Sequence, residues 1–196
     1  MAEQLPLAVV LHGSIGVGKT TLGIALACHL GGSYIDGDQF QQAGRPRFAS
    51  SRKVAGDLVK AAVSATHTGA PAVLGHPLRC TDYIFLKHRL ALAGVRSFFI
   101  NLRAPLEIIV APGRGRSFND WERQRMAEMI EQGYNNRPWS NAWIDTQDLE
   151  KRACGRSWKR WLDQTLYKRT AENQAGHLPS HDWVEAECLP VVGSRL

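Results

Sequence analysis

The sequence predicts an α/β domain in which a five-stranded parallel sheet is covered by helices on both faces. Short apolar runs of strand type alternate about five times with stretches of helix type, and this alternation is typical of parallel strands joined by crossover helices. The first apolar run leads directly into a glycine-rich turn and a helix-like stretch. A complete strand–turn–helix unit is therefore expected near the start of the chain.

Strands are expected where short apolar runs are bounded by turn-forming or charged residues. The first run extends from Leu7 to Leu11, and the longest is centred on Phe98, Phe99 and Ile100. Because these runs are nearly continuous in apolar character, they fit strands that are buried on both faces of a parallel sheet. The expected strands cover residues 7–11, 33–36, 72–74, 95–102 and 142–145.

Helices are expected where apolar residues recur every three or four positions, as Leu22 and Leu26 do in the first of them. Ser50 or Ser51 can cap the second helix. Residues 37–50 contain glycine and proline and lack an apolar period, so we expect a loop there. The expected helices cover residues 19–30, 52–67, 80–92, 104–110, 121–132 and 148–167.

The composition is that of an ordinary globular protein. The 196 residues are 44% hydrophobic and 21% charged, which is enough for one domain with a sizeable core. We expect this domain over residues 1–170, followed by a polar tail over residues 171–196. No apolar run approaches the roughly 20 residues of a membrane span, and the first residues lack the basic region of a signal peptide. Four scattered cysteines favour a reducing cytoplasm over a disulfide framework or a zinc site; they are Cys28, Cys80, Cys154 and Cys188.

The glycine-rich turn carries the strongest functional signal. Gly13, Gly18, Lys19 and Thr20 fit the pattern G-x-x-x-x-G-K-[ST], the P-loop. In this motif backbone N–H groups and the N-terminus of the following helix hold phosphate oxygens, the lysine reaches the β- and γ-phosphates, and the hydroxyl holds Mg²⁺. The expected nucleotide-binding residues are Gly13, Ser14, Ile15, Gly16, Val17, Gly18, Lys19, Thr20 and Thr21.

Two carboxylates stand where the second expected strand ends. Asp36 and Asp38 are two residues apart, so in an extended chain they face the same way and can enter one site. Phosphoryl transfer needs a metal near the phosphates and a group that accepts the acceptor's proton. Asp36 can serve the metal and Asp38 the acceptor hydroxyl; the alternative is a turn, for which Asp-Gly is a common pair. No aspartate follows the strand 72–74, the usual place for a second metal ligand.

Further basic residues are candidates for contact with the acceptor or with the transferred phosphate. Arg45 and Arg47 follow the Asp-Gly-Asp turn, and His76 lies at the end of the third expected strand. Each can instead be a surface charge or a structural residue. Arg114 and Arg116 lie in a loop with two glycines and a proline, which suits a hinged lid over the phosphates. Guanidinium groups brought in by such a lid stabilise charge in the transition state.

These motifs resemble those of small-molecule kinases of the P-loop superfamily. The residues that carry the resemblance are the segment 13–21, Asp36-Gly37-Asp38, and Pro77-Leu78-Arg79. Gluconate kinase, adenylylsulfate kinase and shikimate kinase have similar segments in the same order. The resemblance implies a three-layer P-loop NTPase fold, ATP and Mg²⁺ as cofactors, a lid around residues 111–133, and a small acceptor. It also implies that Asp38 is the acceptor-contacting base and that Arg79 contacts the acceptor.

Three functions are compatible with these residues. The first is a cytoplasmic ATP- and Mg²⁺-dependent phosphotransferase that acts on a hydroxyl of a small molecule. The second is a nucleoside, nucleotide or polynucleotide kinase, which the net charge of +6 suits. The third is a nucleotide-binding regulatory module with little catalysis. An acceptor base at Asp38 favours the enzymes over the regulatory module, since a module that only binds nucleotide needs no such base.

Overall fold

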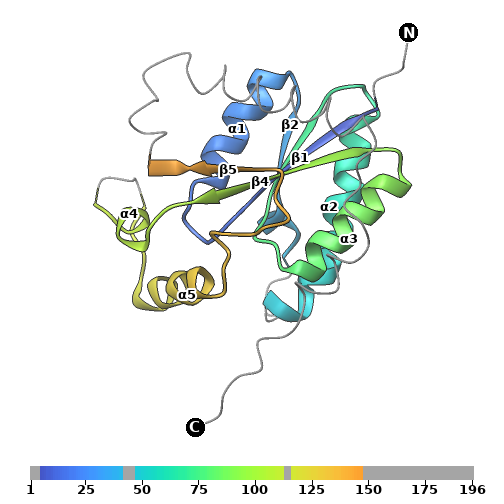
Figure 1. Cartoon of the computed structure of the whole chain (residues 1–196). Coiled ribbons are helices and arrows are strands. Elements are labelled where there is room, and N and C mark those ends of the chain that lie inside the picture. Colours follow the sequence, from blue (N-terminus) through green and yellow to red (C-terminus); the bar gives the residue numbers. More distant parts are fainter. Residues whose placement is uncertain (1–4, 42–46, 113–115, 148–196) are drawn as a thin grey trace.

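The computed structural model describes residues 5–41, 47–112 and 116–147, and it contains a five-stranded parallel sheet (Figure 1). The strands lie in the order β2-β3-β1-β4-β5, and every pair of neighbours is parallel. The strands are β1 (Leu7–His12), β2 (Ser33–Asp36), β3 (Ala72–Gly75), β4 (Arg96–Arg103) and β5 (Ala142–Asp145). The parallel five-stranded sheet expected from the sequence is confirmed.

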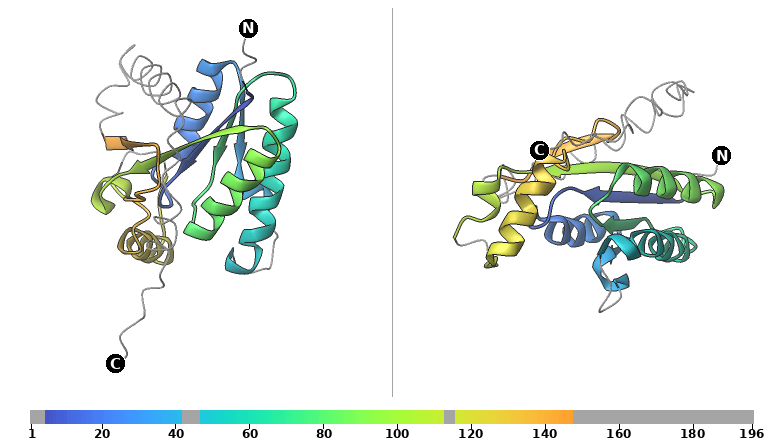
Figure 2. Two further views of the ribbon diagram at one scale, coloured as in Figure 1. Left: turned by 45° about the vertical axis from the view of Figure 1, so that its right-hand side comes forward. Right: turned by 90° about the horizontal axis from the view of Figure 1, so that it is seen from below.

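The helices connect the strands and cover both faces of the sheet. In Figure 1, α1 lies on one side of the strands and α2 and α3 lie on the other, and Figure 2 shows the same layering from two further directions. The helical elements are α1 (Lys19–Leu30), the 3₁₀ turn η1 (Gly37–Phe40), α2 (Arg47–Thr66), α3 (Cys80–Leu92), α4 (Leu106–Ile109) and α5 (Asp120–Glu131).

The two faces of the sheet belong to separate hydrophobic clusters. Val9 and Leu11 of β1 pack in one cluster with Leu22 and Leu26 of α1. Ala8 and Val10 pack in the other, together with buried residues of α2 and α3 such as Leu58. Successive residues of a strand point to opposite faces, so one apolar strand supplies both clusters. The continuous apolar runs in the sequence therefore reflect a sheet buried on both sides.

Some element boundaries differ from the expected ones. Helix α2 begins at Arg47, so Ser50 and Ser51 lie inside it and do not cap it. Helix α4 is a single turn, Leu106–Ile109, shorter than the expected 104–110.

Parts of the expected organisation lie outside the described residues. These are the helix over residues 148–167, the tail over residues 171–196, and residues 113–115 within the lid expected around 111–133. In the part of the chain that is described, no helix combines the length and the apolar character needed to cross a membrane.

Candidate active site

The P-loop connects the end of β1 to the start of α1, and two of its glycines are required for different reasons. Gly13 has φ of 143°, and a methyl group on it would overlap the carbonyl oxygen of Leu102 on β4. Gly18 has open space around it, but its φ of 97° disfavours any other residue. The sequence assigns these glycines to the approach of phosphate; the structure shows that Gly13 also lets the loop pass close to β4.

Lys19 reaches back across the loop that precedes it. Its Nζ donates to the backbone carbonyl of Ser14 at 2.6 Å and lies 3.4 Å from that of Gly13. The ammonium group is therefore held above the loop, next to the N-terminus of α1, where backbone N–H groups also carry positive partial charge. Positive potential at this place comes from the Lys19 ammonium group, the loop N–H groups and the N-terminus of α1. This arrangement suits bound phosphate.

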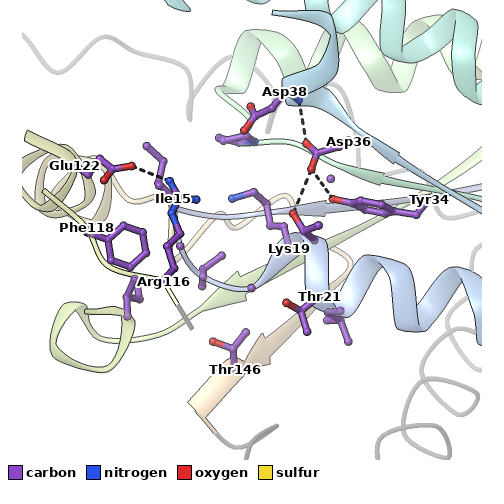
Figure 3. A pocket seen from close by; sticks show the side chains of 18 of the residues that line it. Ile15, Lys19, Thr21, Tyr34, Asp36, Asp38, Arg116, Phe118, Glu122 and Thr146 are labelled. Carbon is purple, nitrogen blue, oxygen red and sulfur yellow. Dashed lines mark hydrogen bonds and ion pairs between the residues drawn. The ribbon is translucent and has the colours of Figure 1, made fainter. Parts of the chain in front are cut away.

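The Asp36 carboxylate is fixed by several donors (Figure 3). Thr20 Oγ1 donates to Asp36 Oδ2 at 3.2 Å, and the Tyr34 hydroxyl donates to the same oxygen at 3.4 Å. The backbone N–H of Asp38 donates to Asp36 Oδ1 at 3.0 Å, so Asp36 also caps η1. Burial raises the pKa of Tyr34 to about 12. The phenol therefore stays protonated at neutral pH and remains a donor to Asp36.

Asp38 is exposed, and its carboxylate enters the same cavity as Asp36 (Figure 3). Gln41 Nε2 donates to Asp38 Oδ1. Among the described residues, no donor contacts Asp38 Oδ2. A carboxylate oxygen of this kind can accept a proton from a ligand hydroxyl placed in the cavity. The two aspartates thus differ in their surroundings, one pinned by donors and the other accessible.

The cavity encloses about 570 Å³ and lies between the P-loop, the end of β2 and the segment that precedes α5. This volume is within the usual range for small-molecule sites. On one side it is lined by the P-loop from Ile15 to Thr21 and by Tyr34, Asp36 and Asp38. The lining on the other side comes from Ile109, Arg116, Phe118, Trp121, Glu122 and Thr146.

The oxygen donors beside the P-loop fit Mg²⁺. Thr20 and Asp36 present a hydroxyl and a carboxylate that already lie 3.2 Å apart. Mg²⁺ prefers oxygen ligands and is usually held by one or two protein groups together with phosphates and water. In the described ranges no group of three or more His, Cys, Asp or Glu side chains gathers. The donor set therefore suits a metal that arrives with a nucleotide rather than one held by the protein alone.

The segment before α5 packs against the P-loop. A methyl group on Gly16 would lie 2.7 Å from Ile109 Cγ2 and 2.9 Å from Phe118 Cζ. Arg116 Nη2 lies 2.7 Å from Glu122 Oε1, and its guanidinium stands 5.0 Å from the centroid of the Phe118 ring. Arg116 thus lines the cavity and is paired with Glu122, which lines the same side of it. Arg114 lies outside the described residues.

The residues that the sequence predicts to contact the acceptor are not gathered around the cavity in the part of the chain that is described. Arg79 precedes α3, with an exposed side chain whose Nε lies 3.8 Å from Asp82 Oδ2, and it is not part of the cavity lining. His76 is buried against Gly37, beneath the turn that leads to Asp38, and it does not line the cavity either. Arg45 and the side chain of Arg47 lie outside what the structure describes.

A buried polar network beneath the P-loop was missed by sequence reasoning. His12 is fully buried; its Nδ1 lies 3.2 Å from Asn101 Nδ2 and its Nε2 lies 3.0 Å from Ser140 Oγ. Because the amide nitrogen of Asn101 is a donor, Nδ1 accepts and Nε2 carries the proton. Asn101 also donates to the carbonyl of Tyr134 at 2.8 Å. The signal available in the sequence is a polar residue within each of two apolar strands.

The network predicts a pH-dependent stability. Burial, followed by the positive charges of Arg137 and Lys19, lowers the pKa of His12 to about 3 from 6.5. Below pH 6.5 the unfolded chain binds a proton at His12 that the folded chain does not bind. The neutral His12 therefore contributes its full share to the free energy of unfolding above pH 6.5, and this share is lost as the pH falls towards 3. Between pH 7 and pH 5 the loss is about 2 kcal/mol.

Urea unfolding of the wild type and of His12→Gln at both pH values measures this loss. The glutamine variant lacks the titrating group, so its stability should fall by about 2 kcal/mol less over the same interval. An equal fall in the two proteins would contradict the assignment of a neutral buried imidazole.

Comparison with known proteins gives fold neighbours at low sequence identity. No family model and no curated protein matches the chain. A gluconokinase from Sinorhizobium meliloti 1021 is similar with a TM-score of 0.58 at 18% identity, over 88% of this chain and 98% of that one. A sugar kinase from Janibacter sp. HTCC2649 gives 0.55 at 21% identity, over 82% and 95%. Shikimate kinase from Aquifex aeolicus gives 0.51 at 14%, over 86% and 99%. The chain therefore has the fold of the P-loop small-molecule kinases, as its motifs predict.

Proposed function

We propose that the protein is an ATP- and Mg²⁺-dependent phosphotransferase that moves the γ-phosphate to a hydroxyl of a small molecule. The observation that carries this proposal is the joint placement of Lys19, Thr20, Asp36 and Asp38 around one cavity. A phosphate cradle, oxygen ligands for a metal and an accessible carboxylate are the groups that phosphoryl transfer to a hydroxyl requires. The kinase fold of the structural neighbours supports the same chemistry.

The nucleotide side is formed by residues 13–21, with the triphosphate over the loop amides. Lys19 supplies positive charge beside the β- and γ-phosphates. Thr20 and Asp36 are the residues that would hold Mg²⁺, which neutralises phosphate charge when it is bound. Because Asp36 is pinned by Thr20, Tyr34 and the backbone of Asp38, its carboxylate needs little reorganisation to take up this role.

Asp38 is the proposed acceptor base. As the acceptor oxygen forms its bond to the γ-phosphorus, the bond from phosphorus to the β–γ bridging oxygen breaks and ADP leaves. The proton of the acceptor hydroxyl passes to a carboxylate oxygen of Asp38. Arg45, Arg47, His76 and Arg79 remain the proposed contacts for the rest of the acceptor. Of these, His76 and Arg79 do not line the cavity, and Arg45 and the side chain of Arg47 lie outside what the structure describes, so these contacts rest on the sequence alone.

An acceptor screen tests the proposed function. ADP release is measured with ATP and Mg²⁺ in the presence of sugars, sugar acids, nucleosides and aminoglycosides, each against a blank without acceptor. We expect at least one small hydroxyl compound to raise ADP release well above the blank. A polynucleotide as the sole effective acceptor would favour the second candidate enzyme. Tight ATP binding with no stimulation by any acceptor would instead favour a nucleotide-binding module.

Two arginines, Arg114 and Arg116, are candidates for stabilising the transferred phosphate, and of these Arg116 lies among the residues that the structure describes. Arg116→Ala should lower kcat by more than about tenfold, equivalent to ~1.4 kcal/mol of barrier, with a smaller change in ATP affinity. The reason is that its guanidinium lines the cavity and can turn from Glu122 towards developing phosphate charge. Steady-state kinetics with a known acceptor measures the split between kcat and KM.

The matched control is Arg89→Ala, which removes an exposed arginine from the last turn of α3. It should leave both constants unchanged. Wild-type turnover in Arg116→Ala would leave Arg116 as a surface residue paired with Glu122. Arg114→Ala is expected to behave as Arg116→Ala does.

A further inference from the structure

Tyr34 lies two residues before Asp36 on β2, so both side chains leave the strand on the same face. Its hydroxyl lies 3.4 Å from Asp36 Oδ2, the oxygen that also accepts from Thr20 Oγ1. Figure 3 shows the ring pointing along the cavity wall towards Asp36. One carboxylate oxygen therefore receives two hydroxyl donors, one from the P-loop and one from β2.

The Tyr34 ring fits into a space made by two glycines. A methyl group on Gly23 of α1 would overlap Tyr34 Cε2, and a methyl group on Gly75 of β3 would overlap the Tyr34 hydroxyl. Gly75 is paired in register with Asp36. Since neither glycine has a positive φ, the backbone at these positions does not demand glycine. The missing side chains serve instead to admit the ring and to set the position of its hydroxyl.

We propose that Tyr34 is a positioning residue that orients the Asp36 carboxylate, and with it Thr20, for the magnesium ion of a bound nucleotide. This inference rests on the proposed function, because that function assigns Mg²⁺ to Thr20 and Asp36. Asp36 Oδ1 is held by the backbone N–H of Asp38, and Oδ2 by Thr20 and Tyr34. Loss of the phenol removes one of the two hydroxyl donors to Oδ2 and leaves Thr20. A carboxylate with fewer donors samples more orientations.

Tyr34→Phe tests the role, because it keeps the ring between the glycines and removes the hydroxyl alone. Groups that orient a metal ligand typically contribute 10–100-fold to metal affinity. Calorimetric titration with ADP, carried out with and without Mg²⁺, is the measurement. We expect the tightening of ADP binding by Mg²⁺ to fall by about tenfold in Tyr34→Phe, while ADP binding without Mg²⁺ stays at the wild-type value.

Turnover gives a second readout once an acceptor is found. The Mg²⁺ concentration for half-maximal rate should rise by about tenfold, whereas kcat at saturating Mg²⁺ should change much less. Tyr83→Phe is the matched control, since the Tyr83 hydroxyl contacts Lys87 on the surface of α3. It should leave the Mg²⁺ dependence of ADP binding unchanged.

The outcomes separate this inference from the proposed function. If Mg²⁺ tightens ADP binding equally in the wild type and in Tyr34→Phe, the positioning role is overturned and the phosphotransferase proposal stands. If Mg²⁺ does not tighten ADP binding to the wild type, the metal assignment itself fails, and the role of Tyr34 fails with it. Neither result depends on knowing the acceptor.

A double substitution tests the seating of the hydroxyl. Gly75→Ala places a methyl group on the Tyr34 hydroxyl, whereas the nearest ring carbon would be 3.0 Å away. Gly75→Ala should therefore lower the melting temperature more in the wild type than in the Tyr34→Phe background. An equal loss in both backgrounds would show that the hydroxyl is not held against Gly75, and would overturn the inferred fit.

Discussion

Lys19→Ala should abolish measurable phosphoryl transfer while leaving a folded protein. Lys19 Nζ lies over the P-loop, where it donates to the carbonyl of Ser14 at 2.6 Å. It contributes positive charge at the place where phosphate charge develops, and its side chain belongs to neither hydrophobic cluster. Removal of one such preorganised donor typically costs roughly 10²–10³-fold in kcat. Because Lys19→Ala also removes a full positive charge, we expect its loss of kcat to lie at the upper end of this range.

ADP release in the presence of an effective acceptor measures the loss, and circular dichroism checks the fold. Lys60→Ala is the matched control, because Lys60 is a largely exposed lysine of α2 that lies 3.4 Å from Asp57 Oδ1. It should retain wild-type turnover. A Lys19→Ala protein that turns over at the wild-type rate would refute the assignment of residues 13–21 as the phosphate-binding loop.

Asp38→Asn is expected to lower kcat by roughly 10²–10⁴-fold, the usual cost of removing a general base. ATP affinity should change little, because Asp38 faces the cavity beside the P-loop and its carboxylate accepts from Gln41 rather than from residues 13–21. The side-chain amide keeps the shape and can still accept from Gln41 through its oxygen, so the fold should be retained. Steady-state kinetics and nucleotide titration separate the two effects.

Asp57→Asn on the surface of α2 is the control for the loss of one negative charge, since Asp57 pairs there with Lys53 and Lys60. It should leave turnover unchanged. If Asp38→Asn weakened ATP binding and spared kcat, the roles of Asp36 and Asp38 would have to be exchanged. Asp36→Asn, in contrast, is expected to raise the Mg²⁺ requirement.

The fold was predictable because its main signals are local. The apolar runs place all five strands nearly where the structure has them, and the P-loop pattern fixes the turn between β1 and α1. The start of one helix was predicted too late. At the start of α2, Ser50 and Ser51 suggested a cap, but the helix already begins at Arg47.

The candidate site was predictable only where one short segment carries it. The P-loop and the Asp36–Asp38 pair are each contiguous, and parallel strands bring their carboxyl ends to one edge of the sheet. The His12 network could not be predicted in the same way, because its partners Asn101 and Ser140 are 89 and 128 residues away in the sequence. The seat of Tyr34 similarly depends on the register that sets Gly75 beside Asp36.

Burial also separates residues that the sequence treats alike. His76 and Arg79 both follow β3 and were both expected to contact the acceptor, yet His76 is packed beneath Gly37 and Arg79 is exposed at the start of α3. Their side-chain directions depend on the turn between β3 and α3 and on η1 above it. These directions are set by tertiary packing, which cannot be predicted from residue type alone.

The central claim is most directly tested by following the γ-phosphate itself. The protein is incubated with Mg²⁺, ATP labelled in the γ-phosphate and a mixture of small hydroxyl compounds, and the products are separated and identified by mass spectrometry. The account predicts that the label appears in one acceptor in equal amount to the ADP formed, and that Asp38→Asn nearly eliminates this product. Label found only in inorganic phosphate, released at the same rate by the wild type and by Asp38→Asn, would contradict it.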